Sequence, residues 1–398
     1  MDKKTVIIAF GGVSPEHEVS VITAMQTFSA LRDSSYRIVP LYISKSGRWF
    51  TGEYLSKLEN FENLDKIVEN SVPCSMAQNE QGKAVLKEMP GGFLKKSISH
   101  PADVMLTAFH GGDGENGSFQ GLCEMYNIPF TGSGVLSSSA GMDKLTAKSL
   151  CRAHGINVVD DVHFYESEWA DHSESVLNKI SKLGYPVVVK PVHLGSSIGV
   201  SVAEDQKKLI PAIELAFRYD EHVLVEKAVH PLMEINCAVL GSAGDCRTSV
   251  CERPLGREEL LSFSDKYMND SGEAKGMASA AREIPADISA ELTSKIQNTS
   301  KKVFTILNGS GVARLDFLVN SQSQEYFFNE INTIPGSFSF YLWEESGMNF
   351  SELLHELIDL ALERHRRKHG RVQSYETNLL SQKAVKGLKG LKGAGHES

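Results

Sequence analysis

The 398-residue sequence lacks any hydrophobic run long enough to span a bilayer, and its first apolar run, TVIIAF, is too short for a secretory signal. We therefore expect a cytoplasmic protein that does not enter a membrane. An excess of positive charge is also missing, since 41 Lys and Arg face 50 Asp and Glu and the net charge is −9. Because phosphate backbones reward a positive surface, this balance argues against a general nucleic-acid binder.

Two further absences concern cysteines and glycine motifs. The six cysteines form no Cys-x-x-Cys pair and no Cys/His spacing typical of a metal site, so we expect reduced thiols in the core. A Walker A loop, G-x-x-x-x-G-K-[ST], is absent, and GGVSPE near the N-terminus does not fit G-x-G-x-x-G. The second mismatch disfavours a dinucleotide-dependent oxidoreductase.

The N-terminal third of the chain alternates strand patterns with helix patterns. Apolar residues at helical spacing from Val21 to Leu31 predict a helix between two β-rich runs. The predicted strands are 5–10, 37–43 and 102–109. We therefore expect a parallel α/β domain over residues 1–135, with ligands at the carboxyl ends of its strands. Residues 44–100 have poor periodicity, and we interpret them as an insertion whose local structure the sequence does not define.

The rest of the chain predicts two more subdomains and a tail. We expect strands at 187–190, 197–204, 222–229, 234–241, 311–320 and 325–333, and helices at 142–154, 205–217, 287–307 and 350–363. On this pattern residues 136–225 form a central subdomain and residues 226–371 form a C-terminal one. The low-complexity tail, 372–398, is expected to be disordered. Its regularly spaced lysines suit either a solvated tail, which we favour, or contact with a membrane.

Carboxylates and one guanidinium share faces on the last two predicted strands. Residues two apart on a strand point to the same side, so Arg314 pairs with Asp316, and Glu330 pairs with Asn332. Oxygen ligands of this kind suit a magnesium ion that holds nucleotide phosphates. A salt-bridge ladder on a half-exposed sheet is the alternative, and the pattern alone leaves both open.

Lys190 ends an apolar strand, and Gly195–Ser197 follow it before the next strand. Such a lysine can hold a nucleotide phosphate while the N–H groups of the loop cover it, although a plain hairpin turn stays the alternative. Glu226 and Lys227 end another strand, which can offer backbone groups to an adenine edge. Glu234 lies beyond that strand and can reach a ribose.

In their order along the chain these features resemble the ATP-grasp superfamily, and longer motifs resemble the D-alanine–D-alanine ligase family. The motifs are GGVSPEHEVSVITA, FHGGDGENGSFQG, IPFTGSGVLSSSAGMDKLTAK, VVVKPVHLGSSIGV, and ARLDF followed by NEINTIPG. The resemblance implies an α/β (α+β) fold, in which an N-terminal parallel α/β domain precedes a two-part ATP-grasp fold with antiparallel sheets. It also implies ATP-dependent ligation of two D-alanines through D-alanyl phosphate, for peptidoglycan precursors, with Mg²⁺ or Mn²⁺, in a homodimer.

The resemblance also implies roles for individual residues. For ATP, the resemblance implies that Lys144 and Lys190 contact the phosphates, that Glu226 and Lys227 contact the adenine, and that Glu234 contacts the ribose. For the metal, it implies that two magnesium ions are bound by Asp316, Glu330 and Asn332. For the first amino acid, the resemblance implies that Glu16 binds the ammonium and that Ser196 and Tyr267 are the hydrogen-bonded partners of Glu16. It implies that Lys266 lies on a loop that closes on the γ-phosphate, and that Arg314 and the N–H of Gly336 stabilise the oxyanion. It also implies substrate contacts from His110 and Ser337. Asp113 and Glu115 are expected to fix the glycine loop rather than to catalyse.

Two segments depart from the family pattern. The segment PGSFSFYLWEE is shorter than in many members, in which it helps to bind the carboxylate of the second substrate. The loop around Lys266 and Tyr267 is unusual outside these two residues. The alternatives are therefore an ATP-grasp ligase for another amino-acid or hydroxy-acid acceptor, and a non-catalytic ATP-binding module. The neutral phenol of Tyr267 favours an amine as the acceptor.

Overall fold

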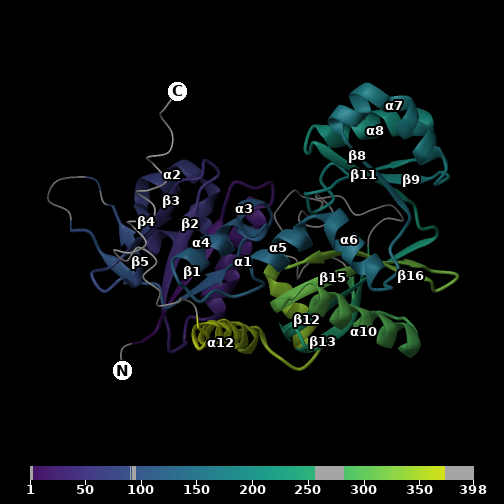
Figure 1. The fold of residues 1–398 in the computed structure, drawn as a ribbon. Helices are drawn as coiled ribbons and strands as arrows, with labels where there is room; N and C mark the ends of the chain where they lie inside the picture. Colours follow the sequence, from purple (N-terminus) through teal and green to yellow (C-terminus); the bar gives the residue numbers. More distant parts are fainter. Residues whose placement is uncertain (1–2, 90, 92–95, 256–281, 373–398) are drawn as a thin grey trace, which may run out of the picture. The chain divides into compact units, whose positions relative to one another are not determined.

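The computed structural model describes residues 3–89, 91, 96–255 and 282–372. Its strands form three sheets, of seven, four and five strands, which follow one another along the chain (Figure 1). Lys266, Tyr267 and the predicted tail beyond residue 372 lie outside the described residues.

The seven-stranded sheet has a parallel centre and an antiparallel extension. β1 (Thr5–Gly11) lies between β2 (Arg37–Ile43) and β7 (Val104–Thr107) and is parallel to both. The extension from β2 consists of β3 (Trp49–Thr51), β4 (Val72–Gln78), β5 (Ala84–Glu88) and β6 (Ser99–Pro101). The N-terminal domain is thus mixed rather than purely parallel, and residues 44–100 are part of its sheet. Periodicity missed them because these strands are short and only partly buried.

Short helices complete the N-terminal domain, and a glycine closes its first strand. The helices are α1 (His17–Ala30), η1 (Glu53–Ser56), η2 (Leu58–Glu62), α2 (Leu64–Asn70), α3 (Gly112–Glu115) and α4 (Ser118–Met125). Gly11, at the end of β1, has φ +89°, and a Cβ there would lie 2.2 Å from the carbonyl oxygen of Ile43. Only glycine therefore allows the chain to leave β1 and turn into α1 at this point.

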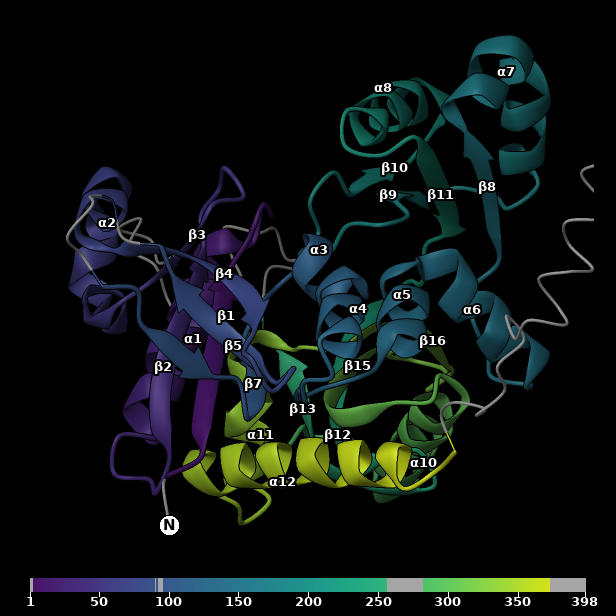
Figure 2. The same ribbon diagram turned by 60° about the vertical axis from the view of Figure 1, so that its left-hand side comes forward.

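The four-stranded sheet is antiparallel. In chain order its strands are β8 (Asp161–Tyr165), β9 (Val187–Pro191), β10 (Ser201–Ala203) and β11 (His222–Lys227). Both views place α7 (Glu166–Ser181) and α8 (Gln206–Phe217) over one face of this sheet (Figures 1 and 2). The strand predicted at 197–204 is shorter, because Ser196 and Ser197 have positive φ angles of 52° and 60°, which no strand accommodates.

The five-stranded sheet carries the last predicted strands. Its members are β12 (Leu232–Ser242), β13 (Asp245–Pro254), β14 (Arg282–Glu283), β15 (Ser310–Asn320) and β16 (Tyr326–Asn332). The helices around it and after it are α5 (Val135–Met142), α6 (Lys144–Ala153), α10 (Ala290–Ile306), η4 (Gly336–Ser339), α11 (Phe340–Glu344) and α12 (Phe350–His369). Ala147 and Cys151 of α6 share a hydrophobic core with Ile296 and Phe304 of α10 and with the sheet. Packing of α6 here brings its first residue, Lys144, next to β16.

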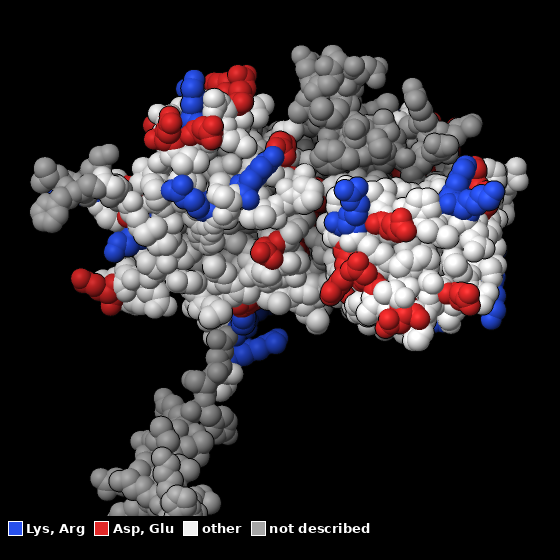
Figure 3. All heavy atoms as spheres, turned by 90° about the horizontal axis from the view of Figure 1, so that it is seen from above, with Lys and Arg blue, Asp and Glu red and all other residues white. Residues whose placement is uncertain are grey.

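The surface charges are of both signs, and the cysteines are unpaired, as the composition predicts. Figure 3 shows Lys and Arg side chains interspersed with Asp and Glu on one face of the molecule. All six cysteines are unpaired, and five of them are buried. Within the described ranges, no helix combines the length and the apolar character that crossing a membrane requires.

Candidate active site

The two strands that carry the predicted metal ligands are neighbours, and their register pairs the polar residues. Asp316 lies opposite Glu330, and Arg314 lies opposite Asn332. Arg314 donates hydrogen bonds of 2.7 and 2.8 Å to the two carboxylate oxygens of Asp316, and the Asn332 amide donates one of 3.1 Å. The prediction that these side chains share a face of the sheet is therefore confirmed.

Arg314 is buried, and its charge depends on its partner. Burial alone would lower the pKa of this guanidinium, but Asp316 holds that pKa well above its ordinary value. Arg314 therefore stays cationic next to a carboxylate that is 15% exposed and can still reach the cleft.

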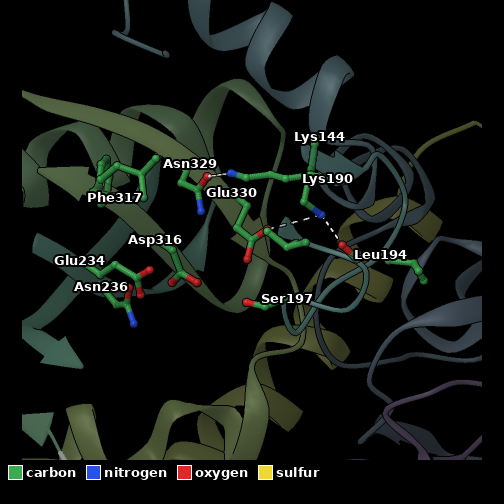
Figure 4. A pocket seen from close by; sticks show the side chains of 12 residues that line it. Lys144, Lys190, Leu194, Ser197, Glu234, Asn236, Asp316, Phe317, Asn329 and Glu330 are labelled. Atoms are coloured by element: carbon green, nitrogen blue, oxygen red, sulfur yellow. Dashed lines mark hydrogen bonds and ion pairs between the residues drawn. The ribbon is translucent and has the colours of Figure 1, made fainter. Parts of the chain in front are cut away.

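Two predicted phosphate lysines reach the same cleft from other elements. The Lys144 ammonium, at the start of α6, lies 3.5 Å from Glu330 Oε2 and also donates to the carbonyl of Leu194 (Figure 4). Lys190, on β9, donates to Glu226 Oε2 at 2.6 Å and to Asn329 Oδ1 at 3.0 Å. Asp316 and Glu234 line the same cleft (Figure 4).

Lys148 is a third lysine near the cleft, which the sequence pattern did not lead us to predict. It contacts the same glutamate as Lys190. It donates to the other carboxylate oxygen of Glu226, and both side chains are almost fully buried. Burial would raise the pKa of Glu226, but Lys148 and Lys190 outweigh it and lower that pKa to about 2. Lys148 lies four residues after Lys144, on the same helix face, and this spacing is the signal that could have revealed it.

We refer to this group of side chains as the charged cleft. Its members are Lys144, Lys148, Lys190, Glu226, Arg314, Asp316 and Glu330. The Glu226 side chain is held by two lysines, and the N–H of Lys227 donates to the carbonyl of Asp160 at 3.0 Å. Their predicted contacts with an adenine remain predictions.

Glu16 lies where three loops meet. It accepts a hydrogen bond from Ser196, the partner that the family resemblance implies. A Cβ on Gly111 would lie 2.6 Å from Glu16 Oε2, and one on Gly195 would lie 3.3 Å from it. Glycine at these positions therefore leaves room for the carboxylate between the loops.

Two buried side chains of the FHGGDGENG segment hold the chain that follows β16. Glu115 accepts hydrogen bonds from the N–H groups of Gly111 at 2.9 Å and Ile334 at 3.0 Å. The His110 ring contacts the Ile334 carbonyl at 2.9 Å and the hydroxyl of Thr23 at 2.8 Å. The expectation that Glu115 fixes the loop is confirmed.

Thr23 extends this contact to the predicted oxyanion segment. Its hydroxyl accepts a hydrogen bond of 3.1 Å from the N–H of Ser337, the residue after Gly336. We call Thr23, His110 and Glu115 the clasp. Because both ring nitrogens of His110 are bonded within the protein, its predicted contact with substrate stays a prediction, as does that of Ser337.

Burial moves the pKa values of the clasp toward neutral forms. It raises the pKa of Glu115 to about 7, and the nearby Glu16 carboxylate adds to this shift. It lowers the pKa of His110 to about 4, although the bond to Ile334 opposes the change. At neutral pH the histidine is therefore uncharged.

Comparison with known proteins identifies the family of this chain. Two family models, described as D-ala D-ala ligase N-terminus and D-ala D-ala ligase C-terminus, match residues 5–133 and 150–359. The chain belongs to the D-alanine–D-alanine ligase family. The resemblance seen in the motifs is confirmed, and as a member of this family the chain is an ATP-dependent ligase.

Individual relatives of this ligase family cover nearly the whole chain. A D-alanine–D-alanine ligase from Thermosipho melanesiensis is 39% identical over 380 residues, which are 95% of this chain and 99% of the relative. The structure of the D-alanine–D-alanine ligase from Coxiella burnetii is 29% identical, with a TM-score of 0.76 over 98% of this chain and 100% of that one. The VanG D-Ala:D-Ser ligase from Enterococcus faecalis is 31% identical, with a TM-score of 0.74 over 90% and 99%. The predicted fold class is confirmed.

Proposed function

We propose that this chain joins two D-alanines to D-alanyl-D-alanine at the expense of ATP, for peptidoglycan precursors. The observation that carries the proposal is that Asp316 and Glu330 meet Lys144 and Lys190 in one cleft, with the buried Arg314 bonded to Asp316. A module that only binds ATP with magnesium needs the lysines and the carboxylates, but it does not need an arginine held next to Asp316. The arrangement therefore favours a ligase over the non-catalytic alternative.

In the proposed reaction, a carboxylate oxygen of the first D-alanine attacks the γ-phosphorus, ADP leaves, and D-alanyl phosphate forms. The amine of the second D-alanine then attacks the acyl carbon, phosphate leaves, and the amine loses a proton. Lys144 and Lys190 cancel phosphate charge, and Arg314 and the N–H of Gly336 stabilise the oxyanion. Glu16 binds the ammonium of the first D-alanine through a charge-assisted hydrogen bond.

Asp316, Glu330 and Asn332 fit the proposed magnesium ions, with manganese as the alternative, because each side chain offers an oxygen. Within the described residues no group of three or more His, Cys, Asp or Glu side chains could hold a metal. The proposed set therefore has two carboxylates, and its third oxygen would come from the amide of Asn332. When bound, magnesium supplies positive charge that screens the phosphates. For metal binding, Asn332 has to turn its oxygen toward the cleft, because its amide nitrogen now faces Asp316.

D-Serine is the second candidate for the acceptor. The likeness to a D-Ala:D-Ser ligase favours it. The short segment after Gly336 leaves the side-chain preference of the acceptor site open. In that segment Ser337, Phe338 and Ser339 have positive φ angles of 51°, 53° and 50°, a run that only a strongly constrained backbone maintains. We infer that this constrained turn shapes the acceptor site.

The decisive experiment incubates the full chain with ATP, Mg²⁺, D-alanine and equimolar D-serine or D-lactate from about pH 6 to 9, and weighs the products. We expect D-alanyl-D-alanine as the main product, with a yield that climbs as the α-amino group loses its proton. A mainly ester product at neutral pH would contradict an amine acceptor. Phosphate release without any condensation product would contradict the ligase itself. Light scattering on the same preparation tests the proposed homodimer.

The variant Glu16→Gln tests the placement of the first substrate. It should raise KM for the first D-alanine far more than KM for ATP, because only the contact with the ammonium is lost. Equal changes in both constants would assign Glu16 a structural role instead.

A further inference from the structure

A histidine bridges two aspartates next to the charged cleft. His193 lies in the loop after β9, and its Nδ1 is 2.9 Å from Asp220 Oδ2. On its other side, Nε2 is 3.5 Å from Asp143 Oδ2. The backbone N–H of His193 also donates to Asp220, at 2.7 Å. The side chain is 48% exposed and does not line the cleft.

Each of the two aspartates also fixes backbone at a functional element. Asp143 is the N-cap of α6, where its Oδ1 accepts from the N–H of Thr146 at 2.8 Å, and the next residue is Lys144. Asp220 Oδ1 accepts from the N–H of His222 at 3.1 Å, at the start of β11. We call Asp143, His193 and Asp220 the histidine latch.

The histidine latch joins two elements of the proposed ATP site, the loop after β9 and the start of α6. His193 begins the segment 193–197, which we call the serine loop. In this loop the carbonyl of Leu194 accepts from Lys144, and Ser196 donates to Glu16. The latch therefore ties the start of the serine loop to the start of α6. The N–H of Lys144 also donates to the carbonyl of Val192 at 3.3 Å, so the latch adds a side-chain connection to a backbone contact between α6 and this loop.

The latch is charged at neutral pH. Hydrogen bonds to Asp143 and Asp220 raise the pKa of His193 to about 10, although burial opposes them. Burial would raise the pKa of Asp143, but His193 lowers it to about 2. On the neighbouring strands, burial, His163 and His193 lower the pKa of His222. The cation of this cluster therefore resides on His193 rather than on His222.

We propose that the histidine latch is a positioning device for the phosphates of ATP. It holds the serine loop and α6 so that Lys144, Lys190 and the loop N–H groups reach one triphosphate together. His193 acts through its two aspartates rather than by touching ATP, and is therefore a positioning residue. The inference rests on the proposed function, which supplies ATP as the ligand of the cleft.

The variant His193→Gln tests the latch, because glutamine keeps a donor but carries no charge and cannot bridge both aspartates. We expect KM for ATP to rise about 5-fold, as for loss of a partly exposed ion pair, while KM for D-alanine changes less than 2-fold. Calorimetry with Mg²⁺ and a non-hydrolysable ATP analogue should show the same loss in affinity. His193→Arg should restore both values, because a planar and permanently charged guanidinium can bond two carboxylates.

Matched variants separate positioning from general damage. His172→Gln changes an exposed histidine of α7 and should leave all constants unchanged. Asp143→Asn keeps an oxygen for the helix cap but removes the charge, so it should act like His193→Gln, and the double variant should be no worse than either.

Three results would overturn the latch: an unchanged KM for ATP in His193→Gln, an equal rise for both substrates, or no recovery in His193→Arg. Failure of the proposed function looks different. In that case the parent chain forms no dipeptide, while the calorimetric comparison of the variants still decides whether the latch positions nucleotide phosphates.

Discussion

The charged cleft and the clasp bury ionisable side chains in opposite ways. In the cleft each charge faces an opposite charge, as Glu226 does between Lys148 and Lys190. In the clasp, His110 and Glu115 bond to neutral backbone and hydroxyl groups. Two buried glutamates therefore differ widely, since the pKa of Glu226 is about 2 and that of Glu115 is about 7.

The difference shows what each region is suited to do. Burial by itself favours the neutral form of any ionisable group, and only partner charges reverse this. The charged cleft contains such partners and so keeps ions that can exchange their contacts for phosphate and metal. The clasp lacks them and holds loops together through hydrogen bonds. Changes in the cleft should therefore alter turnover, and changes in the clasp should alter the dependence of stability on pH.

The largest effect is expected where the cleft faces the proposed metal. Asp316→Asn or Glu330→Gln should lower kcat about 10³-fold, because each change removes a charge that stabilises the reacting phosphates. Phosphate release is measured as a function of Mg²⁺ concentration, and circular dichroism checks the fold. Glu325→Gln, at an exposed position just before β16, is the matched control and should keep the parent's rate. Near-normal turnover of either variant at limiting Mg²⁺ would contradict the metal assignment. The carboxylates of the cleft would then have a structural role, as the side chains of the clasp do.

The next effect concerns the stability of the cleft. Glu226→Gln leaves Lys148 and Lys190 buried without their counter-charge and should lower the free energy of unfolding by about 3–5 kcal/mol. Urea denaturation measures this loss. As a control, Glu168→Gln removes the exposed partner of Lys179 and should cost less than about 1 kcal/mol. A similarly small loss of stability for Glu226→Gln would show that water solvates Lys148 and Lys190, and that these lysines do not need Glu226 as a buried counter-charge.

The smallest expected effect is a dependence of stability on pH, which distinguishes the buried Glu115 from the buried Glu226. The raised pKa of Glu115 means that the folded chain keeps a proton that the unfolded chain releases between pH 4.5 and about 7. This contribution is complete below pH 4.5 and is lost as pH rises through 7. Relative to Glu115→Gln, the parent's free energy of unfolding should fall by up to about 3 kcal/mol between pH 5 and 8.

Two further variants complete this test of the clasp. His110→Gln should reveal the opposite slope, since a lowered pKa makes stability fall as pH decreases from 6.5 to about 4. Asp113→Asn, exposed on the same short helix, should show no slope. If the difference in the free energy of unfolding between the parent and Glu115→Gln does not change with pH, Glu115 is ionised in the folded chain, as Glu226 is.

Local patterns predicted those parts of the fold that depend on neighbouring residues. The strands of Lys190 and Asp316 follow from apolar runs, and Arg314 shares a face with Asp316 because a strand repeats every two residues. The strands within residues 44–100 were not predictable in this way. They are only partly buried, and each takes its place in the sheet by pairing with the strand next to it, starting from β3 on β2.

Motifs and local spacing were enough to predict the family and the order of the strands that carry the phosphate lysine and the carboxylates, because a strand pattern depends on residues close together in the chain. The protonation states of the buried groups, in contrast, depend on contacts between distant segments. Glu226 meets Lys148 across 78 positions of the chain, and Glu115 meets Ile334 across 219. Burial and partner charge set a pKa, and both arise only when distant segments pack together.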